Sequence, residues 1–328
     1  MTSFPEPVKS TAIVLYDPTL PHISIKAHLE SVCAEVARRS LEHAKYAARH
    51  ISQIATNFTG RNFVHITSTS LNTPKSLKRD SCIDIEIFAA ATVDKKPPIL
   101  IFSHGLGQPG KYKPLLGELA SHGYTVLSLT HPSSAKDEDF ATLEQALART
   151  DELADVMANN IQYVLNELRK GTLKISGDTN RIILMGHSLG GAASIMVSRI
   201  DPKISGCVNL DGSLHGSAKT DGLPQPLLLL IGDYQKKISE DEQHPEAGMR
   251  EFAKFERQWQ EEYETLCHNT PHSDKQVIRG AIHMDFTDQP FRDYFAGEKT
   301  LSDAMRVHTI ASREILKFAQ SCLFQSAL

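Results

Sequence analysis

A serine stands between two glycines in Gly186-His187-Ser188-Leu189-Gly190, directly after the apolar run 181–185. This is the G-x-S-x-G pattern, in which small residues let the chain turn sharply from a strand into a helix and push the serine hydroxyl out of the sheet edge. Residues 191–200, rich in small side chains, are typical of the helix that should follow. An inert serine in a glycine-rich turn is the alternative. The flanking strand and helix favour Ser188 as a nucleophile.

A serine hydroxyl becomes reactive when a neighbouring base takes its proton. His283 follows the last predicted strand, 275–280, and imidazole titrates near neutral pH, as proton transfer from serine requires. His187 adjoins the serine and is expected to pack within the turn. The remaining histidines after the serine occupy predicted loops or helices and are expected to be solvated surface residues: His215, His244, His268, His272 and His308. The predicted base is therefore His283.

Two aspartates compete to orient that base. Asp211 ends the predicted strand 205–211, and Asp233 ends the predicted strand 225–233. The carboxyl ends of parallel strands meet at one edge of a sheet, so either carboxylate could reach His283. Strand-end position alone favours Asp233 and leaves both residues open.

The turn after strand 97–104 supplies a further element of acyl chemistry. Its residues Gly105, Leu106 and Gly107 follow a buried strand, where backbone N–H groups can face the serine. We expect the N–H groups of Leu106 and Leu189 to form an oxyanion hole, and each donor contributes about 3 kcal/mol in the transition state. His104 is expected to brace this turn. His131, at the end of strand 124–131, is expected to line the pocket.

Two other chemistries fit the sequence poorly. Residues 105–110, GLGQPG, match the G-x-G-x-x-G pattern of a dinucleotide-binding site, which also needs a helix at the third glycine and an acidic residue for the ribose. Here no helix begins at the third glycine, and strand 124–131 does not end in Asp or Glu. Pairs such as His283 and Asp285 lack further ligands at suitable spacing. We therefore expect no cofactor and no metal.

These residues need a scaffold, and the order of elements predicts a mostly parallel, doubly wound α/β sheet with helices on both faces. In such a sheet, ligands bind at the carboxyl ends of the strands. The remaining strands are expected at 62–71 and 82–89. The predicted helices are 112–122, 143–170, 190–199, 246–266 and 302–322.

The chain is expected to divide near residue 60. Residues 26–58 have apolar positions at helical spacing, so residues 1–59 are predicted to form an N-terminal extension with a long helix, and 60–328 the catalytic domain. That helix is expected to pack on the domain; a membrane-surface helix or a homodimer contact are the alternatives. Segment 234–274, which contains Trp259 as a candidate pocket residue, is either a lid or a plain surface insertion.

Composition narrows the choice of partners and compartment. The formal net charge is −4 and no run of Lys or Arg exceeds two residues, which argues against a nucleic-acid partner. The five cysteines are scattered singly, as in a protein with reduced thiols. The start of the sequence lacks the pattern of a signal peptide, and no apolar run is long enough to span a bilayer. We expect a cytoplasmic protein.

With these residues in place, the chain resembles the platelet-activating-factor acetylhydrolase-like branch of the α/β-hydrolases, from about Asp80 to the C-terminus. The resemblance implies the α/β-hydrolase fold, cleavage of a short-chain or phospholipid-like carboxylic ester, Asp211 as the acid, His283 as the base and no cofactor. Lactone, thioester or acyl-transfer chemistry on the same residues is the alternative, and a non-catalytic ligand-binding module is the rival from another class. The similar blocks are ILIFSHGLG (99–107), LASHGYTVLSLTH (119–131), MGHSLGGAAS (185–194), CVNLDG (207–212) and VIRGAIHMDFTD (277–288).

Overall fold

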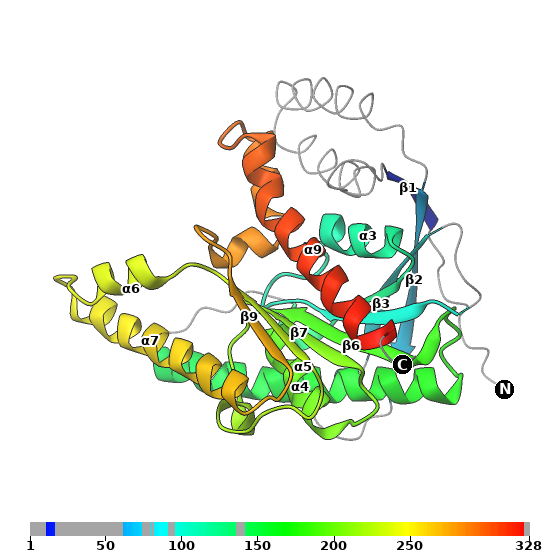
Figure 1. Cartoon of the computed structure of the whole chain (residues 1–328), viewed down its shortest axis with the longest axis horizontal. Helices are drawn as coiled ribbons and strands as arrows, with labels where there is room; N and C mark the ends of the chain where they lie inside the picture. Colours follow the sequence, from blue (N-terminus) through cyan, green and yellow to red (C-terminus); the bar gives the residue numbers. More distant parts are fainter. Residues whose placement is uncertain are drawn as a thin grey trace.

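A single sheet of nine strands, in the order β1-β2-β3-β5-β4-β6-β7-β8-β9, forms the centre of the computed structural model, which describes residues 11–16, 62–73, 80, 82–90, 96–135 and 142–324 (Figure 1). The pairs β1/β2, β2/β3 and β3/β5 are antiparallel, and the pairs from β5 to β9 are parallel. The strands are β1 (Thr11–Tyr16), β2 (Asn62–Asn72), β3 (Cys82–Ala90), β4 (Pro98–Ser103), β5 (Thr125–Thr130), β6 (Asp178–His187), β7 (Gly206–Leu210), β8 (Leu227–Ile231) and β9 (Ser273–Val277).

Helices cover both faces of this sheet, as the continuous apolar strands require. Figure 1 shows α3 and α9 on one side and α4 and α5 on the other. The α-helices are α3 (Lys113–Ser121), α4 (Leu143–Lys170), α5 (Leu189–Ile200), α6 (Gln235–Asp241), α7 (Ala247–His268), α8 (Gln289–Phe295) and α9 (Leu301–Phe324). Short 3₁₀ turns are η1 (Pro132–Ser134), η2 (Gly216–Lys219) and η3 (His283–Phe286).

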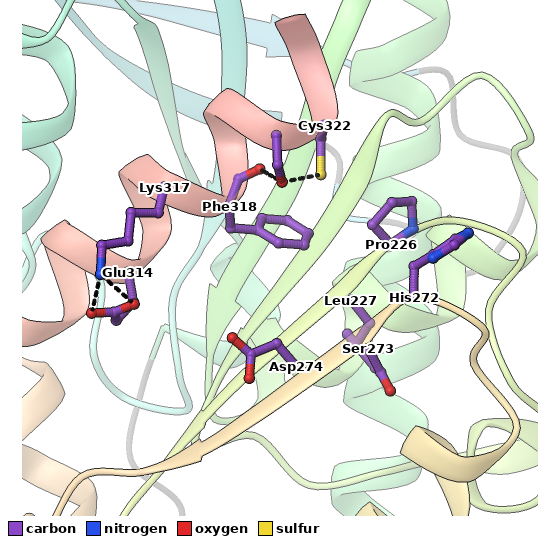
Figure 2. A pocket seen from close by; sticks show the side chains of 10 residues that line it. Pro226, Leu227, His272, Ser273, Asp274, Glu314, Lys317, Phe318 and Cys322 are labelled. Carbon is purple, nitrogen blue, oxygen red and sulfur yellow. Dashed lines mark hydrogen bonds and ion pairs between the residues drawn. The ribbon is translucent and has the colours of Figure 1, made fainter. Parts of the chain in front are cut away.

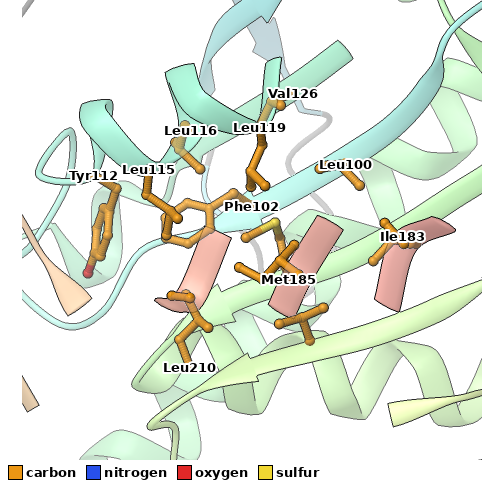
Figure 3. Close-up of a cluster of buried hydrophobic side chains, with 14 of the residues drawn as sticks. Leu100, Phe102, Tyr112, Leu115, Leu116, Leu119, Val126, Ile183, Met185 and Leu210 are labelled. Atoms are coloured by element: carbon orange, nitrogen blue, oxygen red, sulfur yellow. The ribbon is translucent and has the colours of Figure 1, made fainter. Parts of the chain in front are cut away.

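Alternation along each central strand divides the core into two layers. Leu100 and Phe102 of β4 face α3 and α9, and Figure 3 shows Phe102 among the side chains of α3. Ile99 and Ile101 of the same strand face α4 and α5. Because both faces are buried, the strand is apolar from Pro98 to Phe102, and polar groups appear at its carboxyl end, beginning with Ser103.

The predicted mostly parallel, doubly wound sheet is confirmed, and most elements lie within two or three residues of their predicted bounds. Helix α4 matches its prediction because local signals mark both ends. The hydroxyl of Thr142 accepts a hydrogen bond of 3.2 Å from the N–H of Gln145, and Gly171 ends the helix with a φ of 73°.

Two helices and one strand were not predicted, and strand β9 is shifted by two to three residues from its predicted range. Helix α6 is polar apart from the buried Ile238, and α8 is only seven residues long, so neither shows a helical period. Strand β9 begins at Ser273, ahead of the predicted range 275–280, because its polar sequence SDKQV lacks a strand pattern.

The third unpredicted element, β1, lies within the predicted N-terminal extension and joins the central sheet beside β2. The helix expected at 26–58, and with it the expected dimer contact, lies outside the described residues, so the division near residue 60 stays a prediction. None of the described helices has both the length and the apolar character needed to cross a bilayer.

Candidate active site

Ser188 lies at a sharp turn between β6 and α5, with φ 54° and ψ −127°. Its N–H donates a hydrogen bond of 3.0 Å to the carbonyl of Leu210, at the end of β7. The two glycines of the pentapeptide are required by close approach. A Cβ on Gly186 would lie 2.3 Å from the carbonyl carbon of Gly190, and one on Gly190 would lie 2.1 Å from the carbonyl oxygen of Ser103. Positive φ at a non-glycine residue is the strained geometry of a nucleophile elbow.

His283 and Asp211 form a hydrogen-bonded pair. Nδ1 of His283 lies 2.7 Å from Oδ2 of Asp211. Asp211 follows β7, has a φ of 51° and is 3% exposed, whereas the side chain of His283, in η3, is 37% exposed. Two further donors satisfy the carboxylate. The N–H of Gly232 reaches Oδ1 at 2.8 Å, and the hydroxyl of Tyr234 reaches Oδ2 at 2.5 Å.

These donors control the charge of the buried acid. Burial raises the pKa of Asp211, but the hydrogen bond and charge of His283, together with the bonds from Gly232 and Tyr234, outweigh burial and leave that pKa below its ordinary value. Asp211 is therefore ionised at neutral pH and can only accept, so the proton of this bond resides on Nδ1 of His283.

The hydrogen-bond partners of Asp211 and Asp233 distinguish the two aspartates. Oδ2 of Asp233 accepts a hydrogen bond of 3.0 Å from the N–H of Gly280, and its own N–H donates to the carbonyl of Ala281 at 2.8 Å. Asp233 thus ties β8 to the loop that leads into η3, and Asp211 is the residue that contacts His283.

The elbow and the base are neighbours in space. The rings of His187 and His283 have centroids 4.4 Å apart, and Nε2 of His187 lies 3.0 Å from the carbonyl oxygen of His283. A Cβ on Gly212, the residue after Asp211, would lie 2.3 Å from the carbonyl oxygen of Ser188. The segments that carry Ser188, Asp211 and His283 therefore meet at the carboxyl edge of the sheet.

The turn after β4 packs directly against the serine. A Cβ on Gly105 would lie 2.9 Å from Cβ of Ser188, so only glycine fits here. His104 braces the turn as expected, since Nδ1 lies 2.7 Å from the carbonyl of Gly105 and Nε2 accepts the N–H of His131 at 3.0 Å. Within the described residues, the N–H groups of Leu106 and Leu189 make no hydrogen bond.

His131 does not line a pocket as expected, because it is fully buried. Its ring lies 3.0 Å from the hydroxyl of Ser103 and 3.1 Å from the amide nitrogen of Asn160, which in turn donates to Asp80 at 2.7 Å. A buried imidazole needs such partners, and a fully buried ring offers no surface to a ligand. Burial lowers the pKa of His131 well below its ordinary value, and nearby His104 lowers it further.

Trp259 is half-buried on α7, in the segment predicted as a lid or surface insertion. It packs between Phe255 and Tyr263 and against the core formed with β7 and β8. The hydroxyl of Tyr263 donates a hydrogen bond of 2.9 Å to the carbonyl of Gly212, so α7 also contacts the loop after Asp211. The C-terminal half of α7 is thus a layer of the fold, and the lid role of 234–274 stays a prediction.

Two histidines expected at the solvated surface are instead buried. His215 is 5% exposed, with Nδ1 2.5 Å from Oδ1 of Asp151 and Nε2 2.9 Å from the hydroxyl of Ser213. His308 is 6% exposed, with Nε2 2.7 Å from the carbonyl of Thr287. Both histidines lie between elements that are distant in sequence, which a loop or helix position does not reveal. Ser213, His215 and Asp151 thus form a hydrogen-bonded Ser-His-Asp array.

A pocket of about 460 Å³ opens at the other end of the sheet. It lies where β8 and β9 begin, beside the C-terminal half of α9 (Figure 2). Its side chains include His272, Asp274 and Phe318. No group of His, Cys, Asp and Glu suited to a metal ion occurs in the part of the chain that the structure describes.

Curated proteins similar to this chain match only part of it. A probable 1-alkyl-2-acetylglycerophosphocholine esterase of Arthroderma benhamiae is 33% identical over 147 residues, which cover 40% of this chain and 36% of that protein. A platelet-activating factor acetylhydrolase of Canis lupus familiaris is 26% identical over 239 residues, covering 60% and 49%. The chain thus spans half or less of the length of these relatives.

The fold also occurs among solved structures. A ferulic acid esterase from Streptomyces cinnamoneus aligns with a TM-score of 0.59 and 18% identity, covering 78% of this chain and 88% of that one. Residues 100–310 match the model of the alpha/beta hydrolase family. Because that match runs from within β4 into the first half of α9 and includes the elbow, Asp211 and His283, this chain belongs to the alpha/beta hydrolase family.

Proposed function

We propose that this protein is a serine hydrolase that cleaves a carboxylic ester. Ser188 is the nucleophile, His283 the general base and Asp211 the residue that holds the imidazole in the required tautomer. The observation that carries the proposal is the 2.7 Å bond between His283 and the buried, ionised Asp211, beside a serine in strained backbone geometry.

In the first step, Oγ of Ser188 attacks the ester carbonyl carbon while Nε2 of His283 takes the hydroxyl proton. The carbonyl oxygen becomes an oxyanion, which accepts hydrogen bonds from the N–H groups of Leu106 and Leu189. Collapse of this intermediate breaks the bond to the leaving alcohol. His283 gives that alcohol its proton, and the acyl group remains on Ser188 as an ester.

Water then replaces the alcohol. His283 removes a proton from the water, the hydroxide adds to the acyl carbon, and the bond to Oγ of Ser188 breaks as the proton returns to the serine. The products are a carboxylic acid and free enzyme, and neither step needs a metal or an organic cofactor in its atom balance. A lactone, a thioester or a different acyl acceptor would use the same residues.

The names of the relatives support the class of substrate. One curated relative is named an esterase of 1-alkyl-2-acetylglycerophosphocholine, the other an acetylhydrolase of platelet-activating factor, and the solved structure a ferulic acid esterase. We therefore propose a short-chain acyl ester, including phospholipid-like esters, as the substrate.

The cytoplasm is the proposed compartment. The described cysteines, Cys82, Cys207, Cys267 and Cys322, are free thiols, as is usual in a reducing environment. Fractionation of cells that produce the protein at its native level tests this, and recovery from the medium would contradict it.

The test of the reaction is turnover of nitrophenyl esters with short and long acyl chains by the wild type and by Ser188→Ala. Loss of a serine nucleophile lowers kcat by roughly 10⁵ to 10⁶-fold in enzymes of this type. A fluorophosphonate probe should label the wild type at Ser188 and leave the variant unlabelled. Equal, background turnover by both proteins across the panel would show that the chain is not an ester hydrolase and would favour a binding module.

The second Ser-His-Asp array supplies a matched control. Ser213 also lies within hydrogen-bond distance of a histidine, but it is not at the elbow, and Asp151 at the end of that array has a side chain that is 62% exposed. Solvent weakens the influence of such a carboxylate on the imidazole. Ser213→Ala should therefore retain turnover and labelling, and loss of both in this variant alone would transfer the nucleophile to Ser213.

A further inference from the structure

A chain of buried hydrogen bonds runs behind the reactive serine and joins three segments of the site. The N–H of Gly105 donates to the hydroxyl of Tyr112 at 3.0 Å, and that hydroxyl lies 2.9 Å from Nδ1 of His187. Nε2 of His187 lies 3.0 Å from the carbonyl oxygen of His283. These hydrogen bonds thus link three segments: the turn after β4 with residues 105–107 (the oxyanion turn), the residue before Ser188, and the backbone of His283.

The donors and acceptors in this series of hydrogen bonds determine which atom carries each proton. The carbonyl of His283 can only accept, so Nε2 of His187 carries a proton. Burial lowers the pKa of His187 well below its ordinary value, and the charge of nearby His283 lowers it further, so the ring is neutral and Nδ1 is bare. The Tyr112 hydroxyl donates to Nδ1 and accepts from Gly105. Burial also raises the pKa of Tyr112, which keeps its proton.

The two side chains are held rigidly. Tyr112 is 1% exposed with its ring 4.6 Å from that of Phe102, and His187 is fully buried with its ring between Tyr112 and His283. A Cβ on Gly105 would approach Nδ1 of His187 to 3.1 Å, so no other group fits between the turn after β4 and the His187 ring. Buried, fully satisfied networks of this kind fix one arrangement of their surroundings.

We propose that Tyr112 and His187 are positioning residues that hold the oxyanion turn and the base in register on either side of Ser188. The proposal rests on the proposed roles of Ser188, His283 and the Leu106 N–H. Neither side chain touches the substrate. The relay of hydrogen bonds from Gly105 through Tyr112 and His187 to His283 sets the distance between two proposed catalytic groups. One is the Leu106 N–H, which binds the carbonyl oxygen of the substrate, and the other is the His283 imidazole, which takes the proton of the attacking hydroxyl.

Tyr112→Phe removes one oxygen and keeps the ring. It leaves the N–H of Gly105 without its acceptor and Nδ1 of His187 without its donor. A displacement of about 1 Å in a catalytic group can cost on the order of 10²-fold in rate. We expect kcat for a nitrophenyl ester to fall about 10 to 100-fold, with KM changed less than about twofold because the groups that bind substrate are untouched.

His187→Gln cuts the same link from the other side. A glutamine amide can still donate to the carbonyl of His283, but it places no acceptor at the position of Nδ1. Since both substitutions break the bond between Tyr112 and His187, the double variant Tyr112→Phe/His187→Gln should be no slower than the slower single variant. Two independent losses would multiply instead, and a multiplied effect would overturn the relay.

Tyr124→Phe is the control for loss of a buried hydroxyl. Tyr124 is 6% exposed and belongs to the same hydrophobic cluster, but it stands at the amino end of β5, away from Ser188. It should keep the wild-type kcat. A Tyr112→Phe variant that also keeps the wild-type kcat, or that loses activity only through KM, would overturn the proposal.

A readout independent of turnover separates failure of this proposal from failure of the proposed function. In protein labelled with ¹⁵N-histidine, the signals of His187 are those lost in His187→Gln. They should report a neutral ring with the proton on Nε2, unchanged from pH 6 to 8, whether or not any ester is cleaved. A proton on Nδ1, or a ring that becomes charged in this range, would contradict the relay.

Discussion

Tyr234 donates a hydrogen bond of 2.5 Å to Oδ2 of Asp211, the same oxygen that accepts from His283. One carboxylate oxygen thus serves two donors from different strands' ends, while Oδ1 accepts the N–H of Gly232. The acid is fixed from three directions before any substrate arrives, and Tyr234 is a part of the site that no motif contains.

Removal of that hydroxyl in Tyr234→Phe should shift the pH dependence of catalysis. The Tyr234 bond lowers the pKa of Asp211, so its loss raises that pKa, and Asp211 becomes protonated at a higher pH. The acid side of the kcat/KM profile should therefore move to higher pH, with a larger loss at pH 5 than at pH 8. Tyr263→Phe, which removes a hydroxyl bound to the carbonyl of Gly212, is the control. An unshifted acid limb in Tyr234→Phe would contradict this role.

Asp211→Asn and Asp233→Asn should differ sharply. An amide in place of the orienting carboxylate stabilises the wrong imidazole tautomer and costs about 10⁴-fold in kcat in a comparable triad. Asp233 only ties the loop before His283 through Gly280, so Asp233→Asn should lose less than about tenfold. Steady-state kinetics of the two purified variants decide between them, and the reverse order would make Asp233 the acid.

Gly105→Ala should leave a folded protein with little activity. The new methyl would lie 2.9 Å from Cβ of Ser188, so the turn or the serine must move. We expect a fall in kcat of about 100-fold, since a shift of about 1 Å at such groups has that effect. Gly248→Ala, in the first turn of α7 with open space around it, should keep wild-type kinetics. Wild-type activity in Gly105→Ala would show that the turn is not part of the site.

The buried imidazoles should make the fold sensitive to acid. Burial lowers the pKa of His104 from 6.5 to about 4 in the folded protein. Between these two pH values the unfolded chain binds a proton at this residue and the folded chain does not. The stability is therefore full above pH 6.5 and falls as the pH drops through this window. Linkage gives a loss of about 2.5 kcal/mol from His104 between pH 7.5 and 4.5.

Urea unfolding at these two pH values measures that loss. His104→Gln should reduce the pH-dependent difference by about 2.5 kcal/mol. His268→Gln, at an exposed position on α7, should reproduce the wild-type difference. A difference in His104→Gln equal to that of the wild type would refute the assignment.

The sequence predicts the positions of the strands and helices more completely than the contacts within the site. Strands such as β4 and β6 are buried on both faces, so their composition alone marks them, and Thr142 and Gly171 mark the ends of α4. Strand β9 is polar, and its predicted bounds are shifted by two to three residues. Where an element obeys a local rule, its position is predictable.

Contacts between distant segments obey no such rule. Tyr112 and His187 are 75 residues apart, and their meeting depends on how α3 and β6 pack. Asp211 and Asp233 both follow buried strands, and only the loop before η3 decides which one faces His283. His215 resembles a surface residue until the loop before η2 brings it to Asp151 of α4.

The strained backbone of Ser188 has a consequence for evolution and engineering. A φ of 54° costs an ordinary side chain of order 1 kcal/mol or more, whereas glycine adopts it freely. Ser188→Gly should therefore denature at a higher urea concentration than Ser188→Ala, while both are inactive. Position 188 is thus one where a gain in stability requires loss of the proposed nucleophile, so laboratory selection for stability alone should favour an inactive protein.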